Sequence, residues 1–381
     1  MKKLVTMILC VAMVLAMGVG AVAEEKDTIN LGAMLILTTE PLSGAAYRNS
    51  YEMAINEINE AGGVLGKQLV LYGEDMGMTT DMAVNACNKL LARGDLDMII
   101  GCALSGAGLA VEKSVKEAGI PLLLSGTSPK LAEIDNEYVF RMRSSDSVMG
   151  SVAMTFAKDE FNLDENSTVA VLYVNSDFGV GGYDTIKAYC DENGINCVSE
   201  TFNQDDPDAT AQVLNLKNAN PDLLVVWSTG TGFTVASRCI AEQGLECPVL
   251  GSAGLCQKAT LDVCATWVEG WYSICDAIMT ADEPELKAFV EKYTELYGAE
   301  SLSYDCPTAY STIYMIKDAY ERAGSTDTQA FLQAMRETES CKTILGNYHH
   351  FGNIEMASCA AIGRIDNGEL TYIKSVEADL H

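Results

Sequence analysis

The chain has 381 residues, of which 53 are acidic and 25 basic, so its formal net charge at pH 7 is −28. Phosphate groups and anionic lipid headgroups repel such a protein, which excludes nucleic acid and acidic membrane surfaces as its main partners. The length exceeds what one ordinary core holds, and it predicts two domains.

Residues 1–23 have the pattern of a secretory signal peptide. Lys2 and Lys3 precede a long apolar run, and Ala21-Val22-Ala23 supplies an A-x-A cleavage site. An uncleaved membrane anchor is the alternative, because the run is close to the length that spans a bilayer. The place of the A-x-A favours cleavage after Ala23. Cys10 lies inside the apolar run rather than at its end, which argues against a lipoprotein signal. We therefore expect an exported, periplasmic protein.

The sequence contains 13 cysteines. Without Cys10 an even number remains, and in an exported protein this allows disulfides. Free buried thiols are the alternative, and the sequence does not decide between them. No C-x-x-C motif occurs and there are only three histidines, so we expect no zinc or iron–sulfur site and no cofactor. Three pairs of cysteines are close in sequence: Cys190 with Cys197, Cys239 with Cys247, and Cys341 with Cys359.

Apolar runs and amphipathic patterns alternate along the chain, which predicts parallel sheets with right-handed crossovers. Strands are predicted in a first block at 28–37, 67–73, 96–100, 122–124 and 138–142, and in a second block at 168–174, 195–202, 221–227 and 248–251. After 275 the pattern changes to long helices at 283–297, 305–323 and 328–337, followed by short strands near 357–362 and 370–374.

Helices that return after a complete second block predict that the chain crosses back to the first. We predict an α/β fold with one lobe at 24–143 and 276–348 and another at 144–275 and 349–381. Three crossovers, near 143–145, 275–276 and 346–351, join the lobes. A cleft between two such lobes is lined by the carboxyl ends of strands and opens and closes by a hinge.

Two turns of small and hydroxyl residues follow neighbouring buried strands. The first is Ser105-Gly106-Ala107-Gly108, with a helix expected from Leu109, and the second is Ser125-Gly126-Thr127-Ser128. Ligands bind at this edge of open α/β sheets. Unpaired N–H groups at a helix N-terminus favour an anion there. The two turns therefore predict a site for a carboxylate or a small phosphate.

Several short motifs occur in a specific order and spacing. They include Glu57-Ile-Asn-Glu-Ala-Gly-Gly63, Ala118-Gly-Ile-Pro121, Val139-Phe-Arg141 and Asp177-Phe-Gly179. Through them nearly all of the chain after residue 23 resembles the type I periplasmic binding proteins of branched-chain amino-acid and amide ABC transporters. The resemblance implies two Rossmann-like lobes with a three-strand hinge, one ligand between them, and no catalysis. It also implies a monomer that delivers a small carboxylate to an ABC permease. A sensor of the same fold, signalling to a chemoreceptor or kinase, is the alternative.

The resemblance also assigns roles to single residues. The family's carboxylate clamp falls on Ser105 and Thr127 with the backbone N–H groups beside them, at Gly106 and Gly126. The backbone carbonyl of Ser125 would help to hold a ligand ammonium. The aromatic residue that covers the ligand from the second lobe is Phe178 here.

The main departure from the family concerns the acid that pairs with the ligand's ammonium. Ala253 takes its place in the turn Gly251-Ser-Ala-Gly254, and the loop with Thr229 lacks the family's tyrosine. An unpaired buried ammonium is costly, so we expect a carboxylate without an amine, such as an aromatic or branched organic acid.

Two other acids are candidates to replace the missing one. Asp305 precedes a helix, and Glu40 lies in the loop Thr38-Thr-Glu-Pro41. Helix capping by Asp305 and a solvated loop at Glu40 are the alternatives to ligand contact. Trp227 borders either the cleft or the core of its lobe. For Arg141 and Arg143, structural salt bridges are expected rather than ligand contact.

Overall fold

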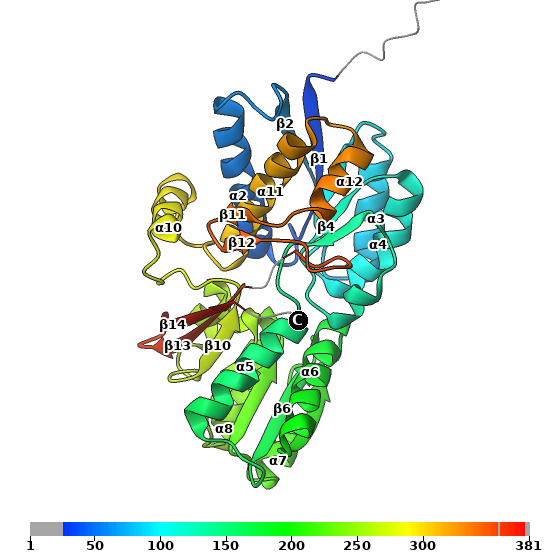
Figure 1. The fold of residues 1–381 in the computed structure, drawn as a ribbon. Coiled ribbons are helices and arrows are strands. Elements are labelled where there is room, and N and C mark those ends of the chain that lie inside the picture. The colour runs from blue at the N-terminus through cyan, green and yellow to red at the C-terminus, as the bar shows by residue number, and fades with distance from the viewer. Residues whose placement is uncertain (1–25, 357–358, 378–381) are drawn as a thin grey trace, which may run out of the picture.

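The computed structural model describes residues 26–356 and 359–377, which form two α/β lobes (Figure 1). The predicted signal peptide lies outside these residues. Within the described part of the chain, no helix combines the length and the apolar character that a membrane span requires.

The first lobe is built on five parallel strands in the order β2-β1-β3-β4-β5. Helices cover both faces of this sheet, which is why its inner strands β1, β3 and β4 are almost continuously buried, whereas the edge strand β2 is only partly so. Alternate residues of β1 illustrate this: Ile29 and Leu31 face the cluster of α2, α11 and α12, whereas Met34 faces that of α3 and α4. The strands are β1 (Thr28–Leu35), β2 (Gln68–Asp75), β3 (Met98–Gly101), β4 (Leu122–Leu124) and β5 (Val139–Arg141). The helices of this lobe are α2 (Pro41–Glu60), α3 (Thr80–Leu91), α4 (Ser105–Ala118), α10 (Pro284–Tyr297), α11 (Asp305–Ala323) and α12 (Thr328–Arg336), with a 3-10 turn η1 (Pro129–Glu133).

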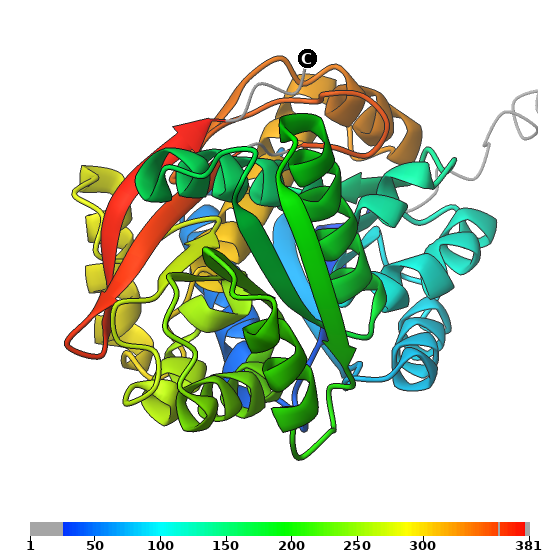
Figure 2. The same cartoon turned by 90° about the horizontal axis from the view of Figure 1, so that it is seen from below.

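The second lobe holds a seven-stranded sheet in the order β14-β13-β10-β9-β8-β6-β7. Five of its strands are parallel, as predicted, whereas β13 and β14 run antiparallel at one edge, drawn in red in Figure 2. The strands are β6 (Thr168–Val174), β7 (Asn196–Phe202), β8 (Leu223–Trp227), β9 (Val249–Gly251), β10 (Tyr272–Cys275), β13 (Cys359–Asp366) and β14 (Glu369–Glu377). The helices are α5 (Asp146–Phe161), α6 (Asp177–Asn193), α7 (Thr210–Asn218), α8 (Gly230–Gln243) and α9 (Lys258–Cys264), with a 3-10 turn η2 (Ala253–Cys256).

Local sequence explains where several helices begin and end. The Ser145 and Ser176 hydroxyls accept backbone N–H groups of the first turns of α5 and α6. Helix α6 ends at Gly194, whose φ of 71° is left-handed, as the Asn193-Gly194 pair predicts. Residues at these ends therefore specify where the helices begin and end.

The chain passes between the two sheets three times: between β5 and α5, between β10 and α10, and between β13 and the preceding hairpin of β11 (Cys341–Thr343) and β12 (Gly346–Tyr348). The residue bounds that the sequence analysis gave for the two lobes remain a prediction.

Some features differ from the prediction. Helix α4 begins at Ser105 rather than Leu109, so the small residues form its first turn instead of a separate loop. Gly108 allows this turn to pack closely, because a Cβ there would lie 3.1 Å from Leu131. Helix α9 and the β11–β12 hairpin were not predicted. The cysteines of the described residues, Cys87 to Cys359, are all free thiols.

Candidate functional site

A cavity of about 90 Å³ lies between the two lobes. One water molecule occupies roughly 10–15 Å³ on this measure, so the cavity has room for about six to nine water-sized groups. A space of that order suits a small organic acid or amino acid. A second, wider cavity of about 260 Å³ lies beside it and shares Glu40, Ser43 and Gln257 with it.

Most of the residues predicted for the site line this first cavity. They come from both lobes and from distant parts of the sequence: Glu40, Ser105, Thr127, Phe178, Trp227, Thr229, Ala253 and Asp305. The sequence analysis left Trp227 open between cleft and core; it is only 1% exposed and belongs to both.

Gly106, Ser125 and Gly126 do not line the cavity. The backbone N–H of Ser125 donates to the Gly101 carbonyl at 2.8 Å. Gly126 lies behind Ser105, because a Cβ at Gly126 would come within 3.0 Å of the Ser105 Cα. A Cβ at Gly106 would meet the carboxylate of Asp177, across the cleft, at 3.1 Å. These three residues support the cavity wall instead.

Ser105 and Thr127 lie together at the N-terminus of α4. The Ser105 Oγ accepts the backbone N–H groups of Thr127 and Ser128 at 3.2 and 3.1 Å. These contacts orient the hydroxyl and leave its hydrogen to donate. An anion at this place would therefore meet the Ser105 hydroxyl rather than the Thr127 N–H, which the serine already occupies. The helix dipole favours the same charge.

The wall from the second lobe is aromatic and apolar. The rings of Phe178 and Trp227 lie 6.2 Å apart, tilted by 32°. Thr229 donates its hydroxyl to the Gln204 side chain at 3.0 Å, so this hydroxyl is engaged within its own lobe. Ala253 opens the short turn η2 and brings only a methyl group to the cavity.

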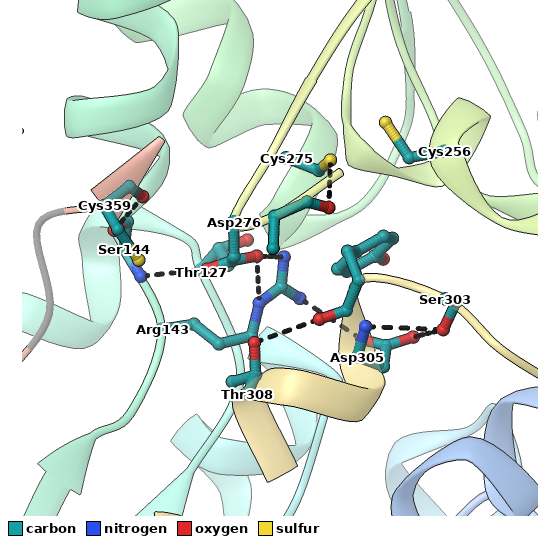
Figure 3. A network of polar contacts seen from close by, with 12 residues as sticks. Thr127, Arg143, Ser144, Cys256, Cys275, Asp276, Ser303, Asp305, Thr308 and Cys359 are labelled. Carbon is teal, nitrogen blue, oxygen red and sulfur yellow. Dashed lines mark hydrogen bonds and ion pairs between the residues drawn. The ribbon is translucent and has the colours of Figure 1, made fainter. Parts of the chain in front are cut away.

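The sequence analysis expected a structural salt bridge for Arg143, and Arg143 forms one with Asp276. Its Nε lies 2.8 Å from an Asp276 oxygen, and its Nη1 lies 3.9 Å from Asp305 (Figure 3). The guanidinium also stacks over the Tyr304 ring at 4.7 Å. Burial disfavours the cation, but Asp276 and neighbouring groups hold the pKa of Arg143 above its usual value. Arg143 also lines the cavity, which the sequence analysis did not anticipate.

Further cavity residues were missed, among them Tyr47, Asp146, Gln257 and Tyr304. A signal for Asp146 exists in the sequence, because it follows Ser144-Ser145 at the predicted first crossover. Tyr304 directly precedes Asp305, the candidate that the sequence did suggest. Tyr47 and Gln257 lie within ordinary helical or turn patterns, which contain no such signal.

Burial changes the acidity of the carboxyl groups in the cavity. It raises the pKa of Asp146 to about 7. It also raises the pKa of Asp305, and that of Glu40, where Asp305 adds to the effect. The charged form of each acid is therefore costly, and Arg143 offsets only part of that cost for Asp146 and Asp305.

The two lobes touch across the cleft. Lys130 of η1 pairs with Asp177 of α6 at 3.0 Å. The Gln257 amide donates to Asp305 at 3.4 Å. These two contacts join residues of the two lobes across the cleft.

The sequence matches the family model described as "Periplasmic binding protein" over residues 28–369. The chain belongs to the periplasmic binding protein family. These are solute-binding proteins and not enzymes, as the resemblance implied. The Leu/Ile/Val-binding protein homolog 3 of Brucella melitensis is 25% identical over 371 residues, with 96% of this chain and 98% of the relative covered.

Two solved structures show the same two-lobed fold. A leucine-binding protein of Thermotoga maritima has a TM-score of 0.85 at 22% identity, covering 92% of this chain and 99% of that one. A solute-binding protein of an ABC transporter from Rhodopseudomonas palustris, in complex with 3,4-dihydroxybenzoic acid, has a TM-score of 0.82 at 18% identity, covering 93% and 98%. The resemblance to type I periplasmic binding proteins of the branched-chain amino-acid group is confirmed.

Proposed function

We propose that this protein is the exported receptor of an ABC importer, to which it delivers a small carboxylate. The observation that carries the proposal is the position of Ser105 and Thr127. Both hydroxyl side chains line a small cavity at the N-terminus of α4. A carboxylate there gains a charge-assisted hydrogen bond and the favourable end of the helix dipole.

The similar proteins support the carboxylate as the common feature of the ligand. Leucine and 3,4-dihydroxybenzoic acid, named for the two solved structures, differ in size and in the presence of an amine. Both contain a carboxyl group. The aromatic pair Phe178–Trp227 offers an apolar surface to the rest of such a molecule.

The place of action follows from the same proposal. The protein is released into the periplasm by cleavage after Ala23, acts as a monomer and presents both lobes to a membrane permease. Mass spectrometry of the secreted protein tests the cleavage site, and a mass that retains residues 1–23 would contradict it. Loss of uptake of the identified ligand in a strain without this protein distinguishes transport from sensing.

A thermal-shift screen tests the ligand class. L-leucine, L-phenylalanine, 4-hydroxybenzoate and 4-methyl-2-oxopentanoate cover amino, aromatic and branched keto acids. At least one carboxylate is expected to raise the melting temperature, because a ligand that binds the native state alone stabilises it. If neither these compounds nor a wider set of carboxylates does so, the proposed ligand class is wrong.

A further inference from the structure

The wider cavity adjoins the one at Ser105, and the two have part of their walls in common. The volume of the wider cavity is about 260 Å³, against about 90 Å³ for the other. Glu40, Ser43 and Gln257 line both cavities, so these three residues stand at the boundary between them. A ligand that is too long for the first cavity would therefore extend past them into the second.

Apolar side chains from both lobes meet in the wider cavity. Helix α2 and the segment before α11 supply Pro41, Leu42 and Leu302, and α9 supplies Ala259 and Val263. Polar residues also line it, yet most of the surface that its wall exposes is apolar. Leu42 is 38% exposed and Val263 is 55% exposed, although most large apolar residues of the described chain are buried. Single exposed apolar residues are ordinary, but a hollow that collects several of them marks a binding surface.

The boundary between the cavities is polar. Gln257 Nε2 donates to Asp305 at 3.4 Å, which leaves the other N–H and the oxygen of this amide for further partners. The Glu40 side chain accepts none of the first-turn N–H groups of α2, so its carboxyl group is not used as a helix cap. The Ser43 hydroxyl both donates and accepts. Covering these groups with a plain hydrocarbon would be costly, whereas a ligand amide satisfies them because it also donates and accepts.

The first cavity limits how much of a ligand it holds. Its volume gives room for about six to nine water-sized groups. The carboxylate, α-carbon and side chain of an amino acid such as leucine come to about eight such groups. A substituent on the α-nitrogen then has to lie outside this cavity, and the wider cavity is the space beside it.

We propose that the wider cavity binds the acyl chain of an N-acylated amino acid, whose carboxylate lies at Ser105 and whose amide passes Glu40 and Gln257. This inference rests on the proposed function and names the class of carboxylate. The groups of such a ligand follow the same order as the groups of the protein: a hydroxyl clamp, a small cavity, a polar boundary and an apolar cavity. An acylated nitrogen carries no charge, so the ligand needs no acid at the position of Ala253, which brings only a methyl group to the cavity.

Chain length tests this inference. Isothermal titration compares the free, N-acetyl and N-hexanoyl forms of L-leucine and of L-phenylalanine, which keep the same carboxylate and side chain. Each methylene that enters the wider cavity should tighten binding by up to about four-fold, and in at least one series the hexanoyl form should bind at least about ten-fold more tightly than the acetyl form. If carboxylates of the thermal-shift screen bind but no hexanoyl form exceeds its acetyl form, the inference is wrong while the proposed function stands. If no carboxylate binds at all, the proposed function fails and this inference fails with it.

An ester analogue tests the amide. The (S)-2-hexanoyloxy-4-methylpentanoate ion keeps the carboxylate, side chain and acyl chain of N-hexanoyl-L-leucine but lacks the N–H group. It should bind about five-fold more weakly, because it has no donor for the Glu40 carboxyl group. Equal affinity of the ester and the amide would overturn the assignment of an N-acylated ligand.

Variants then locate the acyl chain. Ala259→Trp fills the wider cavity from an exposed position, and Leu42→Ser removes apolar surface from its opposite side. Each should weaken the N-hexanoyl probe about five- to ten-fold and leave the N-acetyl probe within two-fold. Leu214→Ser, at a position of α7 that is 40% exposed, matches Leu42→Ser and should change neither affinity. Equal losses for both probes, or an unchanged affinity for the N-hexanoyl probe in both site variants, would overturn the assignment of the acyl chain to this cavity.

Discussion

Arg143 and Asp276 form a buried ion pair, with the guanidinium Nε 2.8 Å from the carboxylate (Figure 3). Arg143 follows β5 and Asp276 follows β10, so the pair joins two of the segments in which the chain passes between the lobes. Asp276 also accepts the backbone N–H of Ser144 at 3.4 Å. One side-chain contact therefore links the two crossovers directly beside the cavity.

Loss of this pair should reduce stability strongly. Asp276→Ala leaves the Arg143 cation buried without its main partner, and removal of one partner from a buried pair costs about 3–5 kcal/mol. The free energy of unfolding from urea denaturation should fall by that amount. Asp159→Ala removes an exposed acid of α5 and serves as the control. It should change the free energy of unfolding by about 0.5 kcal/mol or less. A similar small change for Asp276→Ala would mean that the pair does not stabilise the crossovers.

The hydroxyl groups at the start of α4 should determine ligand affinity. Ser105→Ala and Thr127→Val should each weaken a bound carboxylate by roughly 1–3 kcal/mol, since a charge-assisted hydrogen bond is lost. Isothermal titration with a probe from the thermal-shift screen measures this. Ser151→Ala and Thr155→Val make the same changes at exposed positions of α5 and serve as controls. Unchanged affinity in both site variants would reject the predicted clamp.

Ser105→Ala has a second expected effect. The Ser105 Oγ accepts two backbone N–H groups, and both lose this acceptor in the variant. The unliganded protein should therefore become less stable by about 1–3 kcal/mol. Urea denaturation without ligand separates this structural loss from the loss of binding.

Gly181 allows α6 to approach the first lobe. A Cβ at this position would lie 2.5 Å from the Pro129 ring and 2.9 Å from the Ser128 hydroxyl. Gly181→Ala should therefore hinder full closure and weaken ligand binding by about 1–3 kcal/mol, the usual cost of overpacking. Small-angle scattering with saturating ligand should give a larger radius of gyration than for the natural protein.

A matched change within one lobe controls for this effect. Gly150→Ala also introduces a close contact, with Thr185 at 2.8 Å, but both residues belong to the second lobe. It should lower stability without changing the scattering of the liganded protein. If Gly181→Ala reaches the same compact liganded state as the natural protein, α6 does not limit closure.

Asp146 should make stability depend on pH. Burial raises its folded-state pKa from 3.8 to about 7, so the folded protein retains this proton where the unfolded chain loses it. The stabilising contribution of neutral Asp146 is complete below about pH 4 and is lost as the pH rises to about 7. Asp146→Asn keeps a neutral side chain at every pH, so the variant should gain stability relative to the natural protein by on the order of 2–4 kcal/mol between pH 4 and pH 8.

Urea denaturation of both proteins at several pH values measures this difference. Asp159→Asn, an exposed change on the same helix, should show no such trend. If the difference in free energy of unfolding between the natural protein and Asp146→Asn stays constant from pH 4 to pH 8, Asp146 is ionised throughout that range.

Much of the fold could be predicted because its signals are local. Buried strands such as Leu122–Leu124 are apolar in an unbroken run, and caps such as Ser145 and Gly194 mark helix ends within a few residues. Likewise, Ser105 and Thr127 could be predicted together, since both follow strands that are neighbours in a parallel sheet.

The antiparallel edge of β13 and β14 and the short α9 were less accessible. Helix α9 has only seven residues, and the antiparallel pairing of β13 and β14 depends on which edge of the second sheet is free.

The sequence by itself determined the alternation of strands and helices and the two hydroxyl-bearing turns, at Ser105 and Thr127, that follow neighbouring strands. Only the tertiary structure decided which other charges share the cavity. Glu40, Asp146 and Asp305 are far apart along the chain, and each has an ordinary local reason to stand at a helix start. They meet because two lobes fold from discontinuous segments, and contacts over such separations leave no local pattern in the sequence.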